Sequence, residues 1–357
     1  SCVGHVAFAY WINVKITTRS LIAIVAMAGF FSLPGHAEVP TVAVDIPPVA
    51  SLVRQIMGDL GQPRLILPTG VSPHGYAMRP SQARTLQNAD IVFWVGRDLS
   101  VWLARAIKAL AADAVSVSLS DVPGITLLPF RHGSTFEAHH HDHDAEGSHR
   151  QIPEHEDVPG DGHDNEKNAD RDDETSGRAG YDDHGHNGTD PHVWLDPENA
   201  RVWLEVIAAE MAKLDPDNAS AYFHRAQVGR DALTELIRHL SDQLARIRGR
   251  PFVVFHDAYQ YFEHRFNIGA AGAIVLTEAS DPGPARIAEI RDAVRNLEVN
   301  CVFAEPQFEL KLIATVIEGT DARLGMLDPL GASLQAGPVL YSQLLRNLVR
   351  DLADFLE

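Results

Sequence analysis

The most constraining feature of this sequence is an alternation of short apolar runs with helical patterns, which is found in both halves of the chain. Strands that alternate with helices in this way predict βαβ units and a parallel sheet. We therefore expect an α/β fold with two lobes of parallel sheet flanked by helices. The expected strands are residues 42–44, 65–67, 91–95 and 115–119 in the first half, and 252–255, 273–276, 301–304 and 324–327 in the second.

A long helical segment separates the two halves. Residues 218–248 contain no proline, and their hydrophobic residues recur at helical spacing. A helix of about 30 residues is about 45 Å long at 1.5 Å per residue, which exceeds a single small lobe. We therefore expect an N-terminal lobe over residues 38–216, a linking helix over 217–248 and a C-terminal lobe over 249–357.

Residues 137–190 interrupt the pattern with an acidic, histidine-rich insert. It holds 17 acidic and four basic residues, so it carries −13 of the net charge of −18. With almost no apolar residues it cannot offset the chain entropy lost on folding, and we expect it to be disordered without a ligand. Histidine-rich tracts are typical of metal binding, although a solvated linker would have a similar composition. The candidates for weak secondary metal sites are His139, His140, His141, His143, His184 and His186.

The N-terminal 37 residues resemble an export signal. Two basic residues precede the apolar run 21–33, and Gly35-His36-Ala37 offers small residues where a signal peptidase cleaves. The run is shorter than the roughly 20 apolar residues of a transmembrane helix, although a retained anchor is the alternative. We expect a signal peptide over residues 1–37 and a soluble exported chain. Its negative charge argues against nucleic acid or an anionic membrane surface as partner.

A single histidine is held in the octapeptide D-P-H-V-W-L-D-P, residues 190–197. Asp190-Pro191 opens a turn, because proline fixes its own φ and biases the preceding residue away from helix. Asp196 is a typical N-cap, with Pro197 at the first helical position. His192 thus lies on a short, restrained connection. Such a histidine can be a metal ligand, or simply a structural loop residue.

Three further polar residues follow predicted strands. His74 lies in the loop beyond the strand 65–67, His256 directly follows 252–255, and Asp328 directly follows 324–327. In open α/β sheets, ligands bind at the carboxyl ends of the strands. Together with His192, these residues supply three imidazoles and one carboxylate, a set of donors that suits tetrahedral zinc.

At this point the chain resembles a known family. Its motifs are P-H-G-Y-A-M-R-P-S-Q, L-Q-N-A-D-I-V-F-W-V-G, D-P-H-V-W-L-D-P, V-F-H-D-A-Y-Q-Y-F, C-V-F-A-E-P-Q-F and L-D-P-L-G. In this order they look like the ZnuA family, the zinc-specific solute-binding proteins of bacterial ABC importers. The resemblance runs from about residue 42 to the end, apart from the body of the insert.

The resemblance implies a fold and a function. It implies two lobes bridged by a long rigid helix, with Zn²⁺ in the cleft between them. The implied ligands are His74, His192 and His256, with Asp328 as the fourth. It also implies a periplasmic, monomeric protein that delivers zinc to an ABC transporter permease, and a histidine-rich loop in the place of the insert.

Two positions depart from the family pattern. Related members often pair the cysteine of C-V-F-A-E-P-Q-F with one near the C-terminus, which this chain lacks, so Cys301 is left unpaired. Some members carry an acidic residue just before the first histidine, where this chain has Pro73. That favours Asp328 as the fourth ligand, with water as the alternative.

Other functional classes fit the sequence less well. A zinc hydrolase would keep an open coordination position, and the chain has neither an H-E-x-x-H helix nor a G-x-S-x-G elbow. Glu305 is the candidate general base, although a supporting or helix-capping carboxylate is the simpler interpretation. An adhesin-like or metal-buffering surface protein is a third possibility. Against surface anchoring, Cys2 precedes the apolar run instead of ending it. We therefore expect a binding protein and not an enzyme.

Overall fold

The computed structural model describes residues 38–131, 136, 188–275, 283–308 and 310–357. The predicted signal peptide and the six candidate histidines of the insert lie outside these residues. Within the described part of the chain, no helix is both long and apolar enough to cross a membrane.

The first lobe contains a parallel sheet of four short strands in the order β2-β1-β3-β4. Val42 of β1 pairs with Ile91 of β3, and Ala43 pairs with Arg64 of β2. The strands are β1 (Val42–Val44), β2 (Arg64–Leu65), β3 (Ile91–Trp94) and β4 (Val115–Ser118), and the helices among them are α2 (Pro47–Met57), α3 (Pro80–Gln87) and α4 (Val101–Leu110). A short 3-10 turn, η1 (Leu119–Asp121), follows β4.

The second lobe repeats this topology in the order β6-β5-β7-β8, again with all strands parallel. Its strands are β5 (Phe252–His256), β6 (Gly272–Val275), β7 (Cys301–Ala304) and β8 (Arg323–Met326), and its helices are α7 (Gln260–Phe266), α8 (Pro284–Asn296), α9 (Leu310–Ile317) and α10 (Leu340–Leu356). The predicted α/β fold of two parallel sheets is therefore confirmed. The sulfur-bearing side chain of Cys301 is buried and forms no disulfide.

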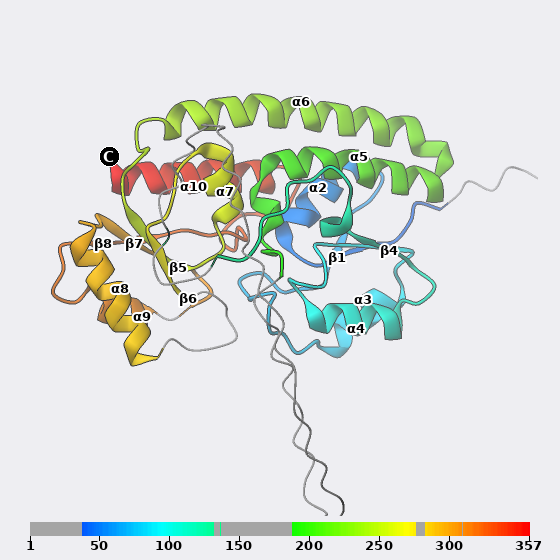
Figure 1. Ribbon diagram of the computed structural model, residues 1–357. Coiled ribbons are helices and arrows are strands. Elements are labelled where there is room, and N and C mark those ends of the chain that lie inside the picture. Colours follow the sequence, from blue (N-terminus) through cyan, green and yellow to red (C-terminus); the bar gives the residue numbers. More distant parts are fainter. Residues whose placement is uncertain (1–37, 132–135, 137–187, 276–282, 309) are drawn as a thin grey trace, which may run out of the picture.

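Between the sheets run η2 (Val193–Leu195), α5 (Pro197–Leu214), η3 (Pro216–Asn218) and α6 (Ala219–Leu244). The helix α6 lies across the top of both lobes in Figure 1, as expected for the linking helix. Its 26 residues make it about 39 Å long. It packs closely on α5, since a Cβ on Gly229 would come within 2.9 Å of Leu204.

The central strands of each sheet, β1 and β3 in the first and β5 and β7 in the second, are buried on both faces, as is general for parallel sheets. Successive side chains of a strand point to opposite faces, so Val42 and Val44 enter a different core cluster from Ala43. The inner faces of both sheets share one continuous cluster with α2, α5, α6 and α10, to which Val44 and Val254 both belong. Because this core is shared, the two lobes are fastened together by apolar packing. Residues at or beyond the carboxyl ends of β2, β5, β7 and β8 line one small cavity between the lobes.

Candidate metal centre

His192 is held by the turn that the sequence predicts. Asp196 caps α5 by accepting a hydrogen bond from the Glu198 backbone N–H at 2.9 Å, and Pro197 takes the first helical position. The carboxylate of Asp190 accepts two bonds through Oδ1, from the His192 backbone N–H at 2.9 Å and from His192 Nδ1–H at 2.7 Å. With the proton on Nδ1, the lone pair of Nε2 is left to face the cavity. Carboxylates orient metal-binding histidines in this way.

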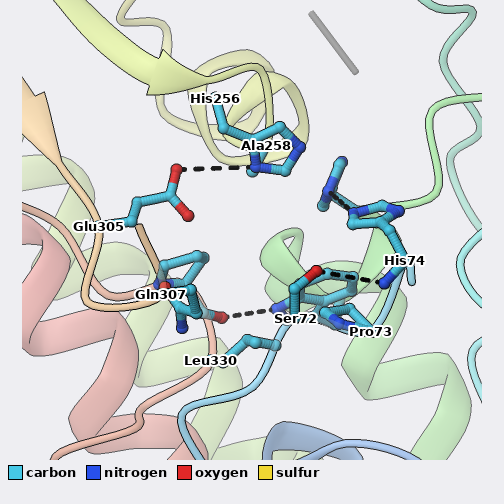
Figure 2. A pocket seen from close by; sticks show the side chains of 11 residues that line it. Ser72, Pro73, His74, His256, Ala258, Glu305, Gln307 and Leu330 are labelled. Atoms are coloured by element: carbon cyan, nitrogen blue, oxygen red, sulfur yellow. Dashed lines mark hydrogen bonds and ion pairs between the residues drawn. The ribbon is translucent and has the colours of Figure 1, made fainter. Parts of the chain in front are cut away.

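His256 ends strand β5, and Glu305 follows strand β7. Both side chains are buried, with exposed fractions of 3% for His256 and 2% for Glu305. Glu305 Oε1 lies 3.7 Å from His256 Nδ1, and Figure 2 shows this carboxylate on one side of the imidazole ring. Parallel strands β5 and β7 are neighbours, so their carboxyl ends place these two side chains together.

His74 lies on the long loop between β2 and α3, where no ladder fixes the backbone. The loop is instead held at the carbonyl of Pro73, which accepts hydrogen bonds from Ser100 Oγ at 3.1 Å and Trp102 Nε1 at 2.8 Å. The backbone N–H of His74 also donates to Ser72 Oγ at 3.3 Å. The first two contacts fix the backbone of Pro73, and the third fixes the backbone of His74 itself. Together they restrict the positions that the His74 ring can take.

The structure brings these three histidines together. Their candidate donor atoms all lie within 4.8 Å of one another, and the Nε2 atoms of His74 and His192 are 3.1 Å apart. Two nitrogens on a tetrahedral zinc ion, each about 2.0–2.1 Å from the metal, would be about 3.4 Å apart. The ring centroids of His192 and His256 are 4.8 Å apart, with the rings at 74°. The cluster therefore has the dimensions of a metal site.

The electrostatics of the cluster favour neutral rings. Burial lowers the pKa of both His74 and His192 well below the ordinary value, and the neighbouring histidines act in the same direction. A neutral imidazole offers its lone pair to a metal without first losing a proton. Burial also raises the pKa of Asp190 to about 7, while the His192 backbone N–H acts in the opposite direction.

The cavity between the histidines has a volume of only about 10 Å³. That is roughly the space of one water-sized sphere, so the cavity suits one ion and excludes an organic substrate. Figure 2 shows His74 and His256 at its sides. The cavity is lined by Ser72, Pro73, His74, His192, Trp194, His256, Ala258, Glu305, Gln307, Pro329 and Leu330.

Asp328, the expected fourth ligand, does not line this cavity. Its two carboxylate oxygens accept hydrogen bonds from the backbone N–H groups of Leu330 at 3.2 Å and Ser333 at 3.3 Å. The carboxylate thus fastens its own loop, and the cavity wall is formed by Pro329 and Leu330. The carboxylate that lines the cavity belongs to Glu305.

A buried ion-pair network lies behind the site and was not anticipated from the sequence. Arg131 binds Asp257, the residue after His256, and donates from Nη1 to Glu263 Oε2 at 2.6 Å. Its guanidinium also lies 3.8 Å from the ring centre of Phe136. Neither of these two carboxylates lines the cavity. A lone arginine after the fourth strand gives no sequence signal of this role, whereas Asp190 is signalled by its place two residues before His192.

Two lobes of parallel sheet, with a candidate metal site of two buried histidines and the half-buried His74 between them, have the architecture of a two-lobed solute-binding protein. The model of the family described as zinc-uptake complex component A, periplasmic (ZnuA), matches residues 42–355. The chain therefore belongs to the ZnuA family, which is a family of solute-binding transport proteins and not of enzymes.

Named relatives agree with this assignment. The chain is 41% identical over 332 residues to the high-affinity zinc uptake system protein ZnuA of Brucella abortus, covering 92% of this chain and 96% of that protein. A crystal structure of ZnuA has a TM-score of 0.68 at 23% identity, covering 89% of this chain and 100% of the other. The crystal structure of a ZnuA deletion mutant with zinc bound has a TM-score of 0.66 at 22% identity. The match covers 89% of this chain and 98% of that one.

Proposed function

We propose that this protein captures Zn²⁺ in the periplasm and delivers it to the permease of a zinc ABC importer. It acts as a monomer and binds the ion as cargo, not as a catalytic cofactor. The observation that carries the proposal is the convergence of His74, His192 and His256 on one small cavity with room for one ion. Family membership supports the transport role, because the relatives in this family are named as zinc uptake proteins.

We propose that the three histidines supply three zinc ligands and that Asp328 supplies the fourth. As a ligand, Asp328 would have to give up its bonds to the backbone of Leu330 and Ser333. Water in the fourth position avoids that cost and is the alternative. In either case the imidazoles carry most of the affinity, since water replaces a carboxylate oxygen more readily than an imidazole nitrogen.

The geometry does not favour the zinc hydrolase. The cavity of about 10 Å³ has no room for an organic substrate beside the ion. Glu305, the candidate general base, lies beside His256 Nδ1, where a carboxylate orients the ring.

The test of the proposed function is metal analysis of protein purified without chelator, together with growth of a zinc-importer deletion strain at low zinc. One tightly held zinc per cleft and restored growth are expected. Protein without zinc that fails to restore growth would contradict the proposal.

Replacing His256 by glutamate is expected to narrow the preference for zinc over manganese by at least about ten-fold, equivalent to 1.4 kcal/mol. Imidazole suits zinc, whereas carboxylates suit manganese. Competition titrations with both ions measure the ratio. His256→Gln is the matched control, because it removes the imidazole without adding a charge and should weaken zinc without favouring manganese. A wild-type protein that prefers manganese would refute the argument.

The histidines of residues 137–190 are proposed to form weaker, exchangeable zinc sites beside the tight one. Ordering such a segment offsets part of its binding energy, and its negative field attracts cations in a salt-dependent way. Replacing residues 137–187 by a short Gly-Ser linker should keep the cleft affinity, reduce total zinc stoichiometry and slow loading at scarce zinc. The ZnuA deletion mutant with zinc bound supports the idea that this fold can lose a segment and still hold its ion. Unchanged stoichiometry and uptake would favour a simple linker.

A further inference from the structure

The indole of Trp194 lies between a metal-binding histidine and the opposite lobe. Trp194 is in η2, two residues after His192, and is 1% exposed. Its ring lies beside the His192 ring, with centroids 5.3 Å apart and planes at 59°, and it forms part of the cavity wall. Since Asp190 holds His192 through Nδ1, the Trp194 ring is a second restraint on the orientation of that imidazole.

Trp194 also makes two hydrogen bonds to residues more than a hundred positions away. Its Nε1–H donates to the carbonyl of Pro329 at 2.8 Å, in the loop that follows β8. Its own carbonyl accepts a bond from the hydroxyl of Tyr341, in α10, at 2.7 Å. Both bonds are buried. The same side chain therefore touches the His192 ring and holds the loop on the other side of the cavity.

The loop held by Trp194 is the one that carries Asp328. Pro329 and Leu330 line the cavity, and Asp328 bonds to the backbone of that loop instead of reaching inward. The indole bond to Pro329 consequently fixes the separation between this wall and the His192 side of the site. A shift of the loop would change both the shape of the cavity and the reach of Asp328.

We propose that Trp194 is a positioning residue that couples the two lobes at the metal site. Its ring restrains His192, its N–H holds the Pro329 loop, and together they set how tightly the ion is retained. This inference rests on the proposed zinc-binding function and adds to it the residue that links the ligand geometry to the opposite lobe.

The test compares the same substitution at two tryptophans. Trp194→Phe keeps an aromatic ring but removes the N–H, leaving the buried Pro329 carbonyl without its donor. Trp203→Phe is the matched control, because Trp203 is also fully buried and its Nε1–H donates to the Leu119 carbonyl at 3.0 Å, away from the cavity. Both variants lose one buried tryptophan hydrogen bond, so both should lower the melting temperature of the zinc-free protein.

Zinc release separates a positioning role from a structural one. For Trp194→Phe we expect zinc to dissociate roughly ten-fold faster, the factor that matches a loss of about 1.4 kcal/mol. For Trp203→Phe we expect a rate within about two-fold of wild type, as for a change remote from the site. The visible absorption of Co²⁺ bound in place of zinc reports coordination geometry, and it should change only in Trp194→Phe. Equal release rates and equal spectra in the two variants would overturn the inference.

A second variant keeps the test decisive if Trp194→Phe does not fold. Tyr341→Phe removes the hydroxyl that binds the Trp194 carbonyl and loosens the same link from its other partner. Faster zinc release than in Trp203→Phe supports the inference, and equal release overturns it. A wild-type protein that binds no zinc would overturn the proposed function and the inference together. If wild type binds zinc but the variants release it at the same rate as Trp203→Phe, only the inference is overturned.

Discussion

Replacing His192 by alanine is expected to weaken zinc binding by at least about a hundred-fold, the upper end of the loss caused by changing a residue that only supports a ligand. His192 is 3% exposed, and its donor atom lies 3.1 Å from that of His74, so alanine removes one of the three converging imidazoles from the site. His74→Ala and His256→Ala should cause similar losses, and each should exceed the loss caused by Asp328→Ala. Competition calorimetry with a chelator of known affinity measures these differences.

Two controls separate loss of a ligand from loss of folding. His224→Ala removes an exposed histidine of α6 and should leave zinc affinity unchanged. The second control is the double variant Asp190→Asn/His192→Ala. Its neutral asparagine replaces the buried carboxylate that bound His192, so no unpaired charge is left inside the fold. If alanine at all three histidines and at Asp328 caused equal and negligible losses, the proposed site would be refuted.

Adding zinc to the metal-free protein is expected to raise its melting temperature by roughly 6–8 °C. A ligand that binds only the folded state adds about 4 kcal/mol when its free concentration is a thousand times its dissociation constant. Each kcal/mol shifts the melting temperature by about 2–4 °C for a protein of 150–250 residues, and by about 1.5–2 °C for a longer chain such as this one, because the unfolding entropy grows with chain length. Differential scanning calorimetry, with and without a chelator, measures the shift.

The His192→Ala protein is the control for this stabilisation. At the same zinc concentration its shift should be at most about a third of that of wild type, because a hundred-fold weaker site adds only about 1.4 kcal/mol. An equal shift in the variant and in wild type would show that zinc stabilises the chain elsewhere, and the histidine cluster would lose its assigned role.

Much of the fold was predictable because parallel sheets impose a simple pattern. Strands buried on both faces appear as short apolar runs, such as Val42–Val44 and Cys301–Ala304. The linking helix was visible because no proline interrupts it, although it ends at Leu244, before the expected end at residue 248. The proposed domain boundaries remain predictions. Edge strands were less certain, and β2 covers only Arg64–Leu65.

The sequence predicted well which strands and loops carry the site residues. It predicted less well which side chains line the cavity. His256 ends a strand and His192 precedes a well-marked helix start, so their positions follow from local structure. The carboxylates were harder, because Glu305 and Asp328 both follow neighbouring parallel strands, β7 and β8. Hydrogen bonds within the loops decide which of the two carboxylates lines the cavity. The bonds that Asp328 accepts from Leu330 and Ser333 cannot be predicted from the spacing of apolar residues in strands and helices.

Diffraction from crystals grown with zinc, measured on both sides of the zinc absorption edge, tests the central claim most directly. The account predicts one strong anomalous peak in the cavity between the lobes, about 2.0–2.1 Å from one nitrogen each of His74, His192 and His256. The same map would show whether Asp328 or water completes the shell. An empty cavity, or a single zinc peak away from these three histidines, would contradict the account.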